Sequence, residues 1–330
     1  MIQHPGVLAL LLASGLVSLM LGFAGWHAVE IMLRWNLRSG SERQLDLERR
    51  TYLVSTLVAN ALVIQILSLF LFVFTADGLH DQFVGAMCAA GSLAANGFGY
   101  PTLLVKLSTC LLAGVWLILH HADTRGHDYP LIRAKHALLL LLVPLVLLET
   151  YLQWRYVAGL KADVMTSCCG SLFGQGRQGL GASLAGLPPQ LMRPAFWSAL
   201  AALLVAGGLV LRKRQGTVPF AILSLAFLVV ATASLISFIG LYIYALPTHH
   251  CPFCLLHKEY GFVGYPLYGA LLGGTISGLG VGALAPFQGR PSLALALPGI
   301  QRKLTWVTLA LALLFTLIVG AWMVLSPLRL

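Results

Sequence analysis

The chain has 330 residues, of which 58% are hydrophobic and 10% are charged, and its formal net charge is +10. Soluble domains usually carry about a quarter charged residues, and a soluble surface could not keep so much apolar side chain away from water, so a soluble globular fold is excluded. The apolar residues gather in runs of about 20, the length at which a helix crosses the hydrocarbon core of a bilayer. The sequence therefore predicts an all-α, polytopic integral membrane protein.

About eight membrane-spanning helices are expected, and together they form a single transmembrane helical domain over residues 1–330. The first apolar run has no positively charged segment before it and is too long for a signal peptide, so we interpret it as a retained helix. In chain order the expected spans are Gly6–Leu33, Tyr52–Thr75, Pro101–Leu119, Ala137–Trp154, Ala195–Leu211, Val218–Leu246, Gly264–Leu284 and Leu304–Leu325.

Basic residues are distributed unevenly between the two sides of these spans. If the N-terminus is outside, the inner loops hold fourteen basic residues and the outer side holds seven. The positive-inside rule then places both termini outside and, in a bacterium, the chain in the inner membrane. The excess of basic residues therefore indicates the topology of the chain, and we expect these residues to lie next to anionic membrane lipid. Nothing in the sequence supports nucleic-acid binding. The inner residues are Arg34, Arg38, Arg43, Arg49, Arg50, Arg125, Arg133, Lys135, Arg212, Lys213, Arg214, Arg290, Arg302 and Lys303, and the outer ones are Lys106, Arg155, Lys161, Arg177, Arg193, Lys258 and Arg329.

The cysteines are distributed in the opposite way, with most of them on the expected outer side. Five of the six fall in the outer loops, which cover residues 76–100, 155–194 and 247–263: Cys88, Cys168, Cys169, Cys251 and Cys254. The outer side of a bacterial inner membrane is the oxidising periplasm, where disulfides form and persist. The sixth, Cys110, lies within the third span, where we expect a small buried hydrophobic residue.

The sequence Cys-Pro-Phe-Cys at residues 251–254 is the strongest local motif. Proline suits the first position of a helix, which would place Cys251 at the N-cap, where unpaired N–H groups and the helix dipole stabilise a thiolate. Cys254, one turn later, would then act as the resolving thiol. The alternatives are a permanent structural disulfide and two thiols without a special role. The motif is similar to the redox motif of glutaredoxins.

Cys168 and Cys169 are adjacent in a glycine-rich loop. Neighbouring cysteines close only a strained ring, and strain makes a disulfide easier to reduce. In one interpretation this loop carries a dithiol between partners. In the others each cysteine pairs elsewhere, with Cys88 or the Cys-Pro-Phe-Cys pair, or the two simply staple the loop.

A Cys-x-x-Cys pair at a membrane helix end, with a second cysteine pair in an outer loop, resembles the arrangement of the DsbB and vitamin K epoxide reductase families. Those families have four or five spans, and the resemblance covers the motifs alone. It implies a thiol–disulfide oxidoreductase in which Cys251 attacks, Cys254 resolves, Cys168 and Cys169 exchange with a periplasmic thioredoxin-like protein, and a quinone takes up electrons. The expected supporting residues are Cys88, His250, His257, Lys258 and the in-span carboxyl group of Glu149.

Two other functions remain open. Thiolate and imidazole donors gather in nine residues and suit a soft metal such as Cu(I), Zn(II) or Hg(II). These candidate metal ligands are His249, His250, Cys251, Cys254 and His257. The chain could instead be a non-catalytic membrane anchor of an electron-transfer complex. Covalent haem is not expected because Leu255, not histidine, follows Cys254, and no nucleotide-binding motif is present.

Overall fold

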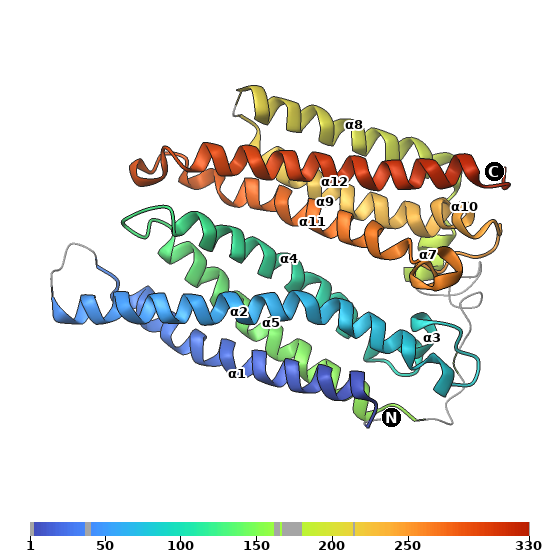
Figure 1. Ribbon diagram of the computed structural model, residues 1–330, viewed down its shortest axis with the longest axis horizontal. Helices are drawn as coiled ribbons and strands as arrows, with labels where there is room; N and C mark the ends of the chain where they lie inside the picture. The colour runs from blue at the N-terminus through green and yellow to red at the C-terminus, as the bar shows by residue number, and fades with distance from the viewer. Residues whose placement is uncertain (1–2, 37–40, 162–165, 167–179, 214, 330) are drawn as a thin grey trace. The chain divides into compact units, whose positions relative to one another are not determined.

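The computed structural model describes residues 3–36, 41–161, 166, 180–213 and 215–329. Eight helices among these residues are long and apolar enough to cross a membrane, which confirms the predicted multi-pass, all-α class. The chain divides into two compact units, which we describe separately (Figure 1). Unit 1 comprises Met1–Thr75, Asn96–Leu160 and Pro286–Ile300, and unit 2 comprises Ala76–Ala95, Lys161–Ala285 and Gln301–Leu330.

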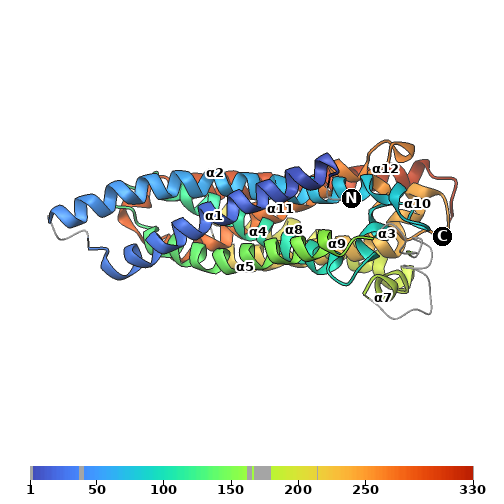
Figure 2. The same ribbon diagram turned by 90° about the horizontal axis from the view of Figure 1, so that it is seen from below.

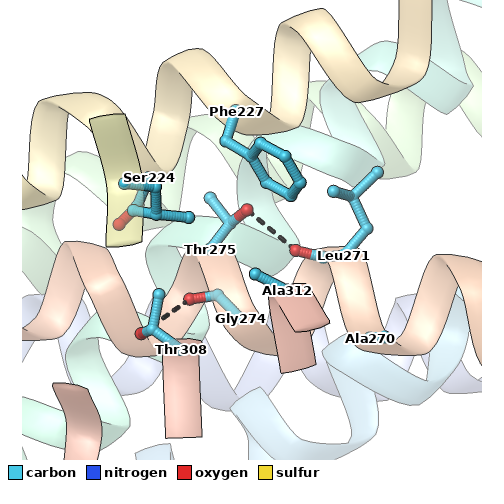
Figure 3. A pocket seen from close by; sticks show the side chains of 9 residues that line it. Ser224, Phe227, Ala270, Leu271, Gly274, Thr275, Thr308 and Ala312 are labelled. Carbon is cyan, nitrogen blue, oxygen red and sulfur yellow. Dashed lines mark hydrogen bonds between the residues drawn. The ribbon is translucent and has the colours of Figure 1, made fainter. Parts of the chain in front are cut away.

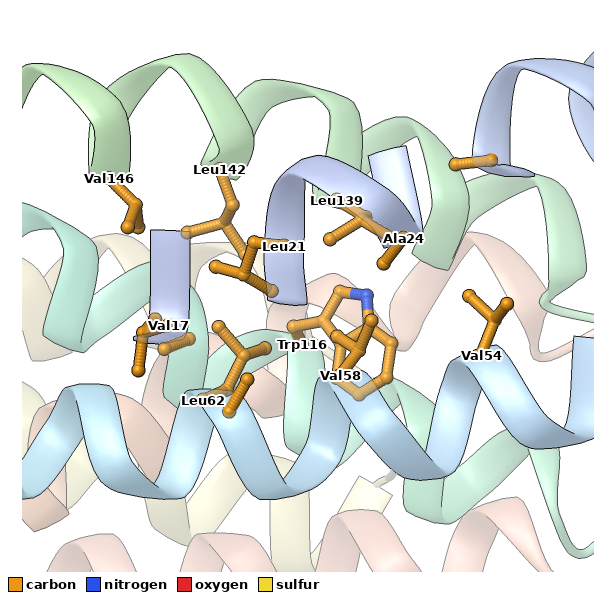
Figure 4. Packing of buried hydrophobic residues seen from close by; sticks show 13 residues of the cluster. Val17, Leu21, Ala24, Val54, Val58, Leu62, Trp116, Leu139, Leu142 and Val146 are labelled. Atoms are coloured by element: carbon orange, nitrogen blue, oxygen red, sulfur yellow. The ribbon is translucent and has the colours of Figure 1, made fainter. Parts of the chain in front are cut away.

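Unit 1 is built on four long helices: α1 (Pro5–Arg34), α2 (Glu42–Gly78), α4 (Gly99–Asp123) and α5 (Ile132–Ala158). Helix α5 packs against both α1 and α4. The helices enclose an apolar core with Trp116 at its centre, to which each of the four contributes (Figure 4). Its largest members are Val17, Leu21, Val54, Val58, Leu62, Trp116, Leu139, Leu142 and Val146. Helix α2 begins ten residues before the span expected at Tyr52, so the segment from Glu42 continues the helix beyond the apolar run.

An ion pair closes the hairpin between α4 and α5. Lys135 Nζ lies 2.6 Å from Asp123 Oδ2, and both side chains are almost fully buried. The other carboxylate oxygen of Asp123 accepts the backbone N–H of Leu131 at 2.8 Å, while Trp116 Nε1 donates to the carbonyl of Lys135 at 2.8 Å. The turn between the helices is therefore held by side chains as well as by its own backbone.

Unit 2 contains the other four spans. They are α8 (Pro189–Lys213), the continuous run of α9 (Thr217–Ser234), the π-helical turn η2 (Leu235–Ile239) and α10 (Gly240–Tyr244), then α11 (Gly264–Ala283) and α12 (Leu297–Leu325). The connection from α11 to α12 contains the short turns η5 (Ala285–Phe287) and η6 (Pro291–Leu293). The rings of Phe196, Phe227 and Phe315 meet between α8, α9 and α12.

Glycines bring α11 close to α9. A Cβ atom at Gly278 would lie 2.1 Å from Ser224 Oγ, and one at Gly282 would lie 2.4 Å from the Ala221 side chain. Small residues four apart allow this kind of approach between membrane helices. The cavity that remains beside Ser224 has a volume of about 10 Å³ (Figure 3), which leaves room for about one water molecule and none for a quinone.

Short elements gather at one end of unit 2, where α3, α7 and α10 lie together (Figure 2). They are η1 (His80–Gln82), α3 (Ala89–Ala94), α7 (Leu180–Ala185), η3 (Cys254–Leu256) and η4 (Lys258–Tyr260). The described cysteines of the predicted outer loops belong to this set of short elements and the loops that join them.

Candidate functional site

Three cysteines from two distant parts of the chain form one cluster in unit 2. The Sγ atoms of Cys88, Cys251 and Cys254 all lie within 4.8 Å of one another. The residues are 0%, 1% and 6% exposed, respectively. The Sγ atoms of Cys88 and Cys251 are 3.5 Å apart, well beyond the S–S bond length of about 2.05 Å, so no disulfide joins them. We refer to Cys88, Cys251 and Cys254 as the three-thiol cluster.

Asp77, at the end of α2, positions Cys88. Its Oδ1 atom accepts the backbone N–H of Ala89 at 2.9 Å and the Nε2–H of His257 at 2.9 Å. Cys88 is the N-cap residue of α3, immediately before Ala89, and His257 follows Cys254 by three residues. A single carboxylate oxygen therefore ties the start of α3 to the loop that carries the Cys-Pro-Phe-Cys motif.

Two tyrosines hold the backbone of that motif. The hydroxyl of Tyr244 donates to the carbonyl of Cys251, and the hydroxyl of Tyr268 donates to the carbonyl of Pro252 at 2.5 Å. The prediction that a helix starts at Pro252 with Cys251 as its N-cap is wrong. The first helical turn after the loop is η3, which begins at Cys254 with Phe253 as its N-cap. Both tyrosine hydroxyls bond to carbonyls of an irregular backbone segment. The thiol of Cys251 belongs to this segment and does not lie at the N-terminus of a helix.

His250 anchors the same loop from the other side. Its Nδ1 atom lies 2.8 Å from the carbonyl oxygen of Ile236, within the π-helical turn η2. A π-helical turn displaces backbone carbonyls from the α-helical pattern, and such turns occur frequently at functional sites. His250 is thus committed through Nδ1 to a backbone contact.

His249 presents a polar atom that the described residues do not satisfy. Its Nε2 atom is buried and has no hydrogen-bond partner among them. The ring packs edge-on against Tyr244 with centroids 4.4 Å apart. Burial lowers the pKa of His249 below its usual value, while the neighbouring Cys88 acts in the opposite direction. The neutral imidazole that burial favours has a lone pair, although His249 is not among the residues whose ligand atoms lie within 4.8 Å of one another.

The other predicted site residues are placed as follows. His257 is bonded to Asp77, and Lys258 is exposed in η4. Cys168 and Cys169 lie outside the described residues. Thr166, two residues before Cys168, donates its N–H to the carbonyl of Val84 at 2.9 Å, next to the segment that leads to Cys88.

Glu149 belongs to a separate buried network in unit 1. Its Oε1 atom is 2.6 Å from Lys106 Nζ, and its Oε2 atom accepts from Gln65 at 2.6 Å and from Thr109 at 2.5 Å. Lys106 also donates to Ser68 at 2.8 Å. Lys106 was expected among the outer basic residues, but it lies inside α4 with its side chain 1% exposed. This network compensates both charges of the pair.

Sequence reasoning missed Asp77, Tyr244 and Tyr268 as site residues. Each is an ordinary residue at the end of an apolar run or inside one, and nothing in its local sequence marks its partner. Asp77 carries the one usable signal, because an acidic residue that ends a spanning helix needs a partner or water.

Comparison of the chain with protein-family models, with curated proteins and with solved structures finds no match. Three adjacent thiols can act as thiolate ligands to a soft metal, or two of them can be oxidised to a disulfide.

We expect Asp77→Ala to expose the cluster, because the variant loses the acceptor shared by Ala89 and His257. Loss of such bonds costs on the order of 1–3 kcal/mol, so local opening should make alkylation of Cys88 about tenfold faster. The measurement is the rate of modification by a maleimide, followed by mass spectrometry. Asp81→Ala is the matched control, because the Asp81 carboxylate is exposed and contacts His80 alone among the described side chains. Equal rates in the two variants would contradict the role of Asp77.

A second prediction concerns the ion pair of unit 1. Lys106→Met leaves the Glu149 carboxylate buried without its counter-charge, so the apparent stability in detergent should fall by about 3–5 kcal/mol. The double variant Lys106→Met with Glu149→Gln removes both charges and should recover most of this loss. Thermal unfolding of the three proteins provides the test. If the double variant is no more stable than the single one, the carboxylate is not the source of the loss.

Proposed function

We propose that the chain is a membrane protein that binds a soft metal ion through the three-thiol cluster. The observation that carries this proposal is the convergence of three buried sulfurs within 4.8 Å. A metal–sulfur bond of about 2.3 Å places the sulfurs of one metal roughly 3.8 Å apart, inside the observed range. Thiolate ligands favour Cu(I), Zn(II) and related soft ions over Mg²⁺ or Ca²⁺.

Burial favours a metal over a protein as the species that reaches the cluster. Thiol–disulfide exchange with another protein requires direct access of an attacking sulfur to the bond it breaks. Cys88, Cys251 and Cys254 are nearly closed to solvent, whereas a metal ion needs only a narrow path. A third thiol within reach of the first two also suits a metal, because a disulfide uses two.

A thiol–disulfide oxidoreductase is the second candidate, and the 3.5 Å between the sulfurs of Cys88 and Cys251 favours it. In this function the two thiols form an S–S bond and release two electrons and two protons to a membrane quinone, which becomes a quinol. Cys168 and Cys169 would then reduce this disulfide by thiol–disulfide exchange, with Cys254 as the intermediate thiol, and would become a disulfide themselves. That disulfide would oxidise the dithiol of a thioredoxin-like partner, which is the source of the two electrons and two protons. The difference from the sequence expectation is that Cys88, in addition to Cys254, lies within reach of Cys251.

We also propose that the cluster faces the outer side of a bacterial inner membrane, with both termini on that side. The two-fold excess of basic residues in the opposite loops supports this orientation. Metal or thiol exchange would then take place with the periplasm.

The function is tested with the purified full-length chain in detergent, loaded with Cu(I) or Zn(II) under reducing conditions and freed of excess metal. We expect one equivalent of metal per chain, thiolate-to-metal charge-transfer absorption in the ultraviolet, and loss of both signals on treatment with a strong chelator. Cys88→Ser and Cys251→Ser should weaken binding at least tenfold, because each removes a ligand. Cys110→Ser is the control, since Cys110 is buried in α4 of unit 1.

If the wild-type chain retains no metal, the metal function is wrong. Formation of a Cys88–Cys251 disulfide on addition of a quinone, with quinol produced in equal amount, would then favour the oxidoreductase.

A fourth ligand from His249, in addition to the three thiols, would distinguish Zn(II) binding from Cu(I) binding. Zn(II) takes four ligands in structural sites, whereas three thiolates satisfy Cu(I) more readily. We expect His249→Gln to weaken Zn(II) binding at least tenfold and to leave Cu(I) binding unchanged, measured by competition with chelators of known affinity. His121→Gln is the control, because His121 is an exposed residue in the last turn of α4 in unit 1. Equal Zn(II) affinity in wild type and His249→Gln would exclude the imidazole as a ligand.

A further inference from the structure

The three-thiol cluster supplies sulfur ligands alone. Among the described residues, no histidine nitrogen or carboxylate oxygen joins Cys88, Cys251 and Cys254 in a group whose ligand atoms all lie within 4.8 Å of one another. Structural Zn(II) sites are almost always four-coordinate, so this set is one ligand short of a zinc site. A cluster of three sulfurs therefore suits an ion that forms three bonds to sulfur.

The distance between two of the sulfurs indicates the shape of the complex. With metal–sulfur bonds of about 2.3 Å, a planar three-coordinate ion holds its sulfurs roughly 4.0 Å apart, and a tetrahedral ion holds them roughly 3.8 Å apart. A pyramidal ion that carries a lone pair has smaller bond angles, which bring sulfurs at the same bond length to roughly 3.4–3.5 Å. The sulfurs of Cys88 and Cys251 are 3.5 Å apart. Trivalent arsenic is a thiophilic ion with this pyramidal geometry, and antimony shares its chemistry.

The charge of the complex is a second constraint, because a buried net charge is costly. Three thiolates leave two negative charges with Cu(I), one with Zn(II) and none with a trivalent ion. The buried lysines that the structure describes, Lys106 and Lys135, belong to unit 1 and are paired with carboxylates. Lys258 is exposed, and the charged group bonded beside Cys88 is the carboxylate of Asp77, which disfavours further negative charge. The site therefore favours a neutral complex.

We propose that the three-thiol cluster binds trivalent arsenic or antimony, which enters as the neutral trihydroxide. This inference rests on the proposed function, because it names the ligand of the same cluster. Each thiol forms one bond from sulfur to arsenic, and the hydroxide that it displaces leaves as water with the proton of that thiol. Arsenous acid and three thiols thus give one trithiolate complex and three water molecules. No oxidation state changes, and no proton is released.

This condensation suits thiols that are closed to solvent. Ala89 and Ala90, which follow Cys88, and Leu255, which follows Cys254, are all buried. A hydrated cation would have to lose its water among such residues, and the protons of the thiols would have to leave separately. Arsenous acid arrives without charge and carries the protons away in water.

The experiment uses the full-length chain in detergent, reduced with a phosphine and mixed with arsenite. The protein carries Cys168→Ser together with Cys169→Ser, because these two adjacent cysteines would otherwise provide a competing dithiol. We expect native mass spectrometry to show an adduct of one arsenic atom less three hydrogens, the composition of three arsenic–sulfur bonds. An adduct with two such bonds would keep a hydroxyl group on arsenic.

Removal of one thiol tests the third bond. Cys254→Ser, made in the same background, should give an adduct that keeps one hydroxyl group. Its affinity for arsenite, measured by competition with a small dithiol, should fall about a hundredfold, because the third bond forms within a site of high effective thiol concentration. Cys110→Ser is the matched control, since Cys110 is equally buried but lies in α4 of unit 1, and it should change neither the adduct nor the affinity.

Phenylarsine oxide provides a measurement that needs no further variant, because its arsenic already bears one carbon and bonds at most two thiols. Relative to a small dithiol, the chain should therefore favour arsenite over phenylarsine oxide.

The inference is overturned if no arsenic adduct forms, if the adduct keeps a hydroxyl group before any cysteine of the cluster is replaced, or if Cys110→Ser weakens binding as much as Cys254→Ser. Retention of Cu(I) or Zn(II) by a chain that fails these tests would leave the proposed function in place and remove the trivalent ion alone. A chain that retains neither arsenic nor a metal contradicts both.

Discussion

Oδ1 of Asp77 accepts one hydrogen bond from the start of α3 and another from His257, and these two bonds join the loop of Cys88 to the loop of Cys251 and Cys254. Cys88 is far from Cys251 in sequence, and apolar packing alone would leave their separation loosely defined. Hydrogen bonds are directional, and those to a charged acceptor are stronger than neutral ones. The carboxylate therefore fixes the position of one loop relative to the other, and with it the arrangement of the thiols that the two loops carry.

The two units place their reactive groups in different surroundings. In unit 1 the buried Lys106 and Glu149 face each other, and Ser68, Gln65 and Thr109 complete their hydrogen bonds. In unit 2 the buried groups of the cluster are thiols, which can be neutral and are therefore much less costly to bury than a charge. Binding a cation would let them ionise within the protein, because each thiolate would gain a bond to the metal.

The positions of the spans could be predicted because twenty consecutive apolar residues are a local property of the sequence. The ends were less predictable: α2 starts at Glu42 because charged residues such as Arg49 and Arg50 are compatible with a helix that leaves the bilayer. The Cys-Pro-Phe-Cys motif identified two of the three clustered cysteines. That Cys88 joins them depends on the path of the chain after Asp77, and no local pattern encodes that path. Likewise, Lys106 was assigned to the outer side because nothing near it in the sequence reveals its partner Glu149, which lies on another helix.

The π-helical turn η2 determines the direction in which the side chains of the following helix α10 point. The N–H of Gly240 bonds to the carbonyl of Leu235, one residue further back than in an α-helix, so the turn contains one more residue than an α-helical path would need. Each residue of an α-helix turns the chain by about 100°. If the same residues ran as an uninterrupted α-helix, Tyr244 would be turned by about that angle from its present direction towards Cys251. The π-helical turn is thus as much a part of the site as the cysteines themselves.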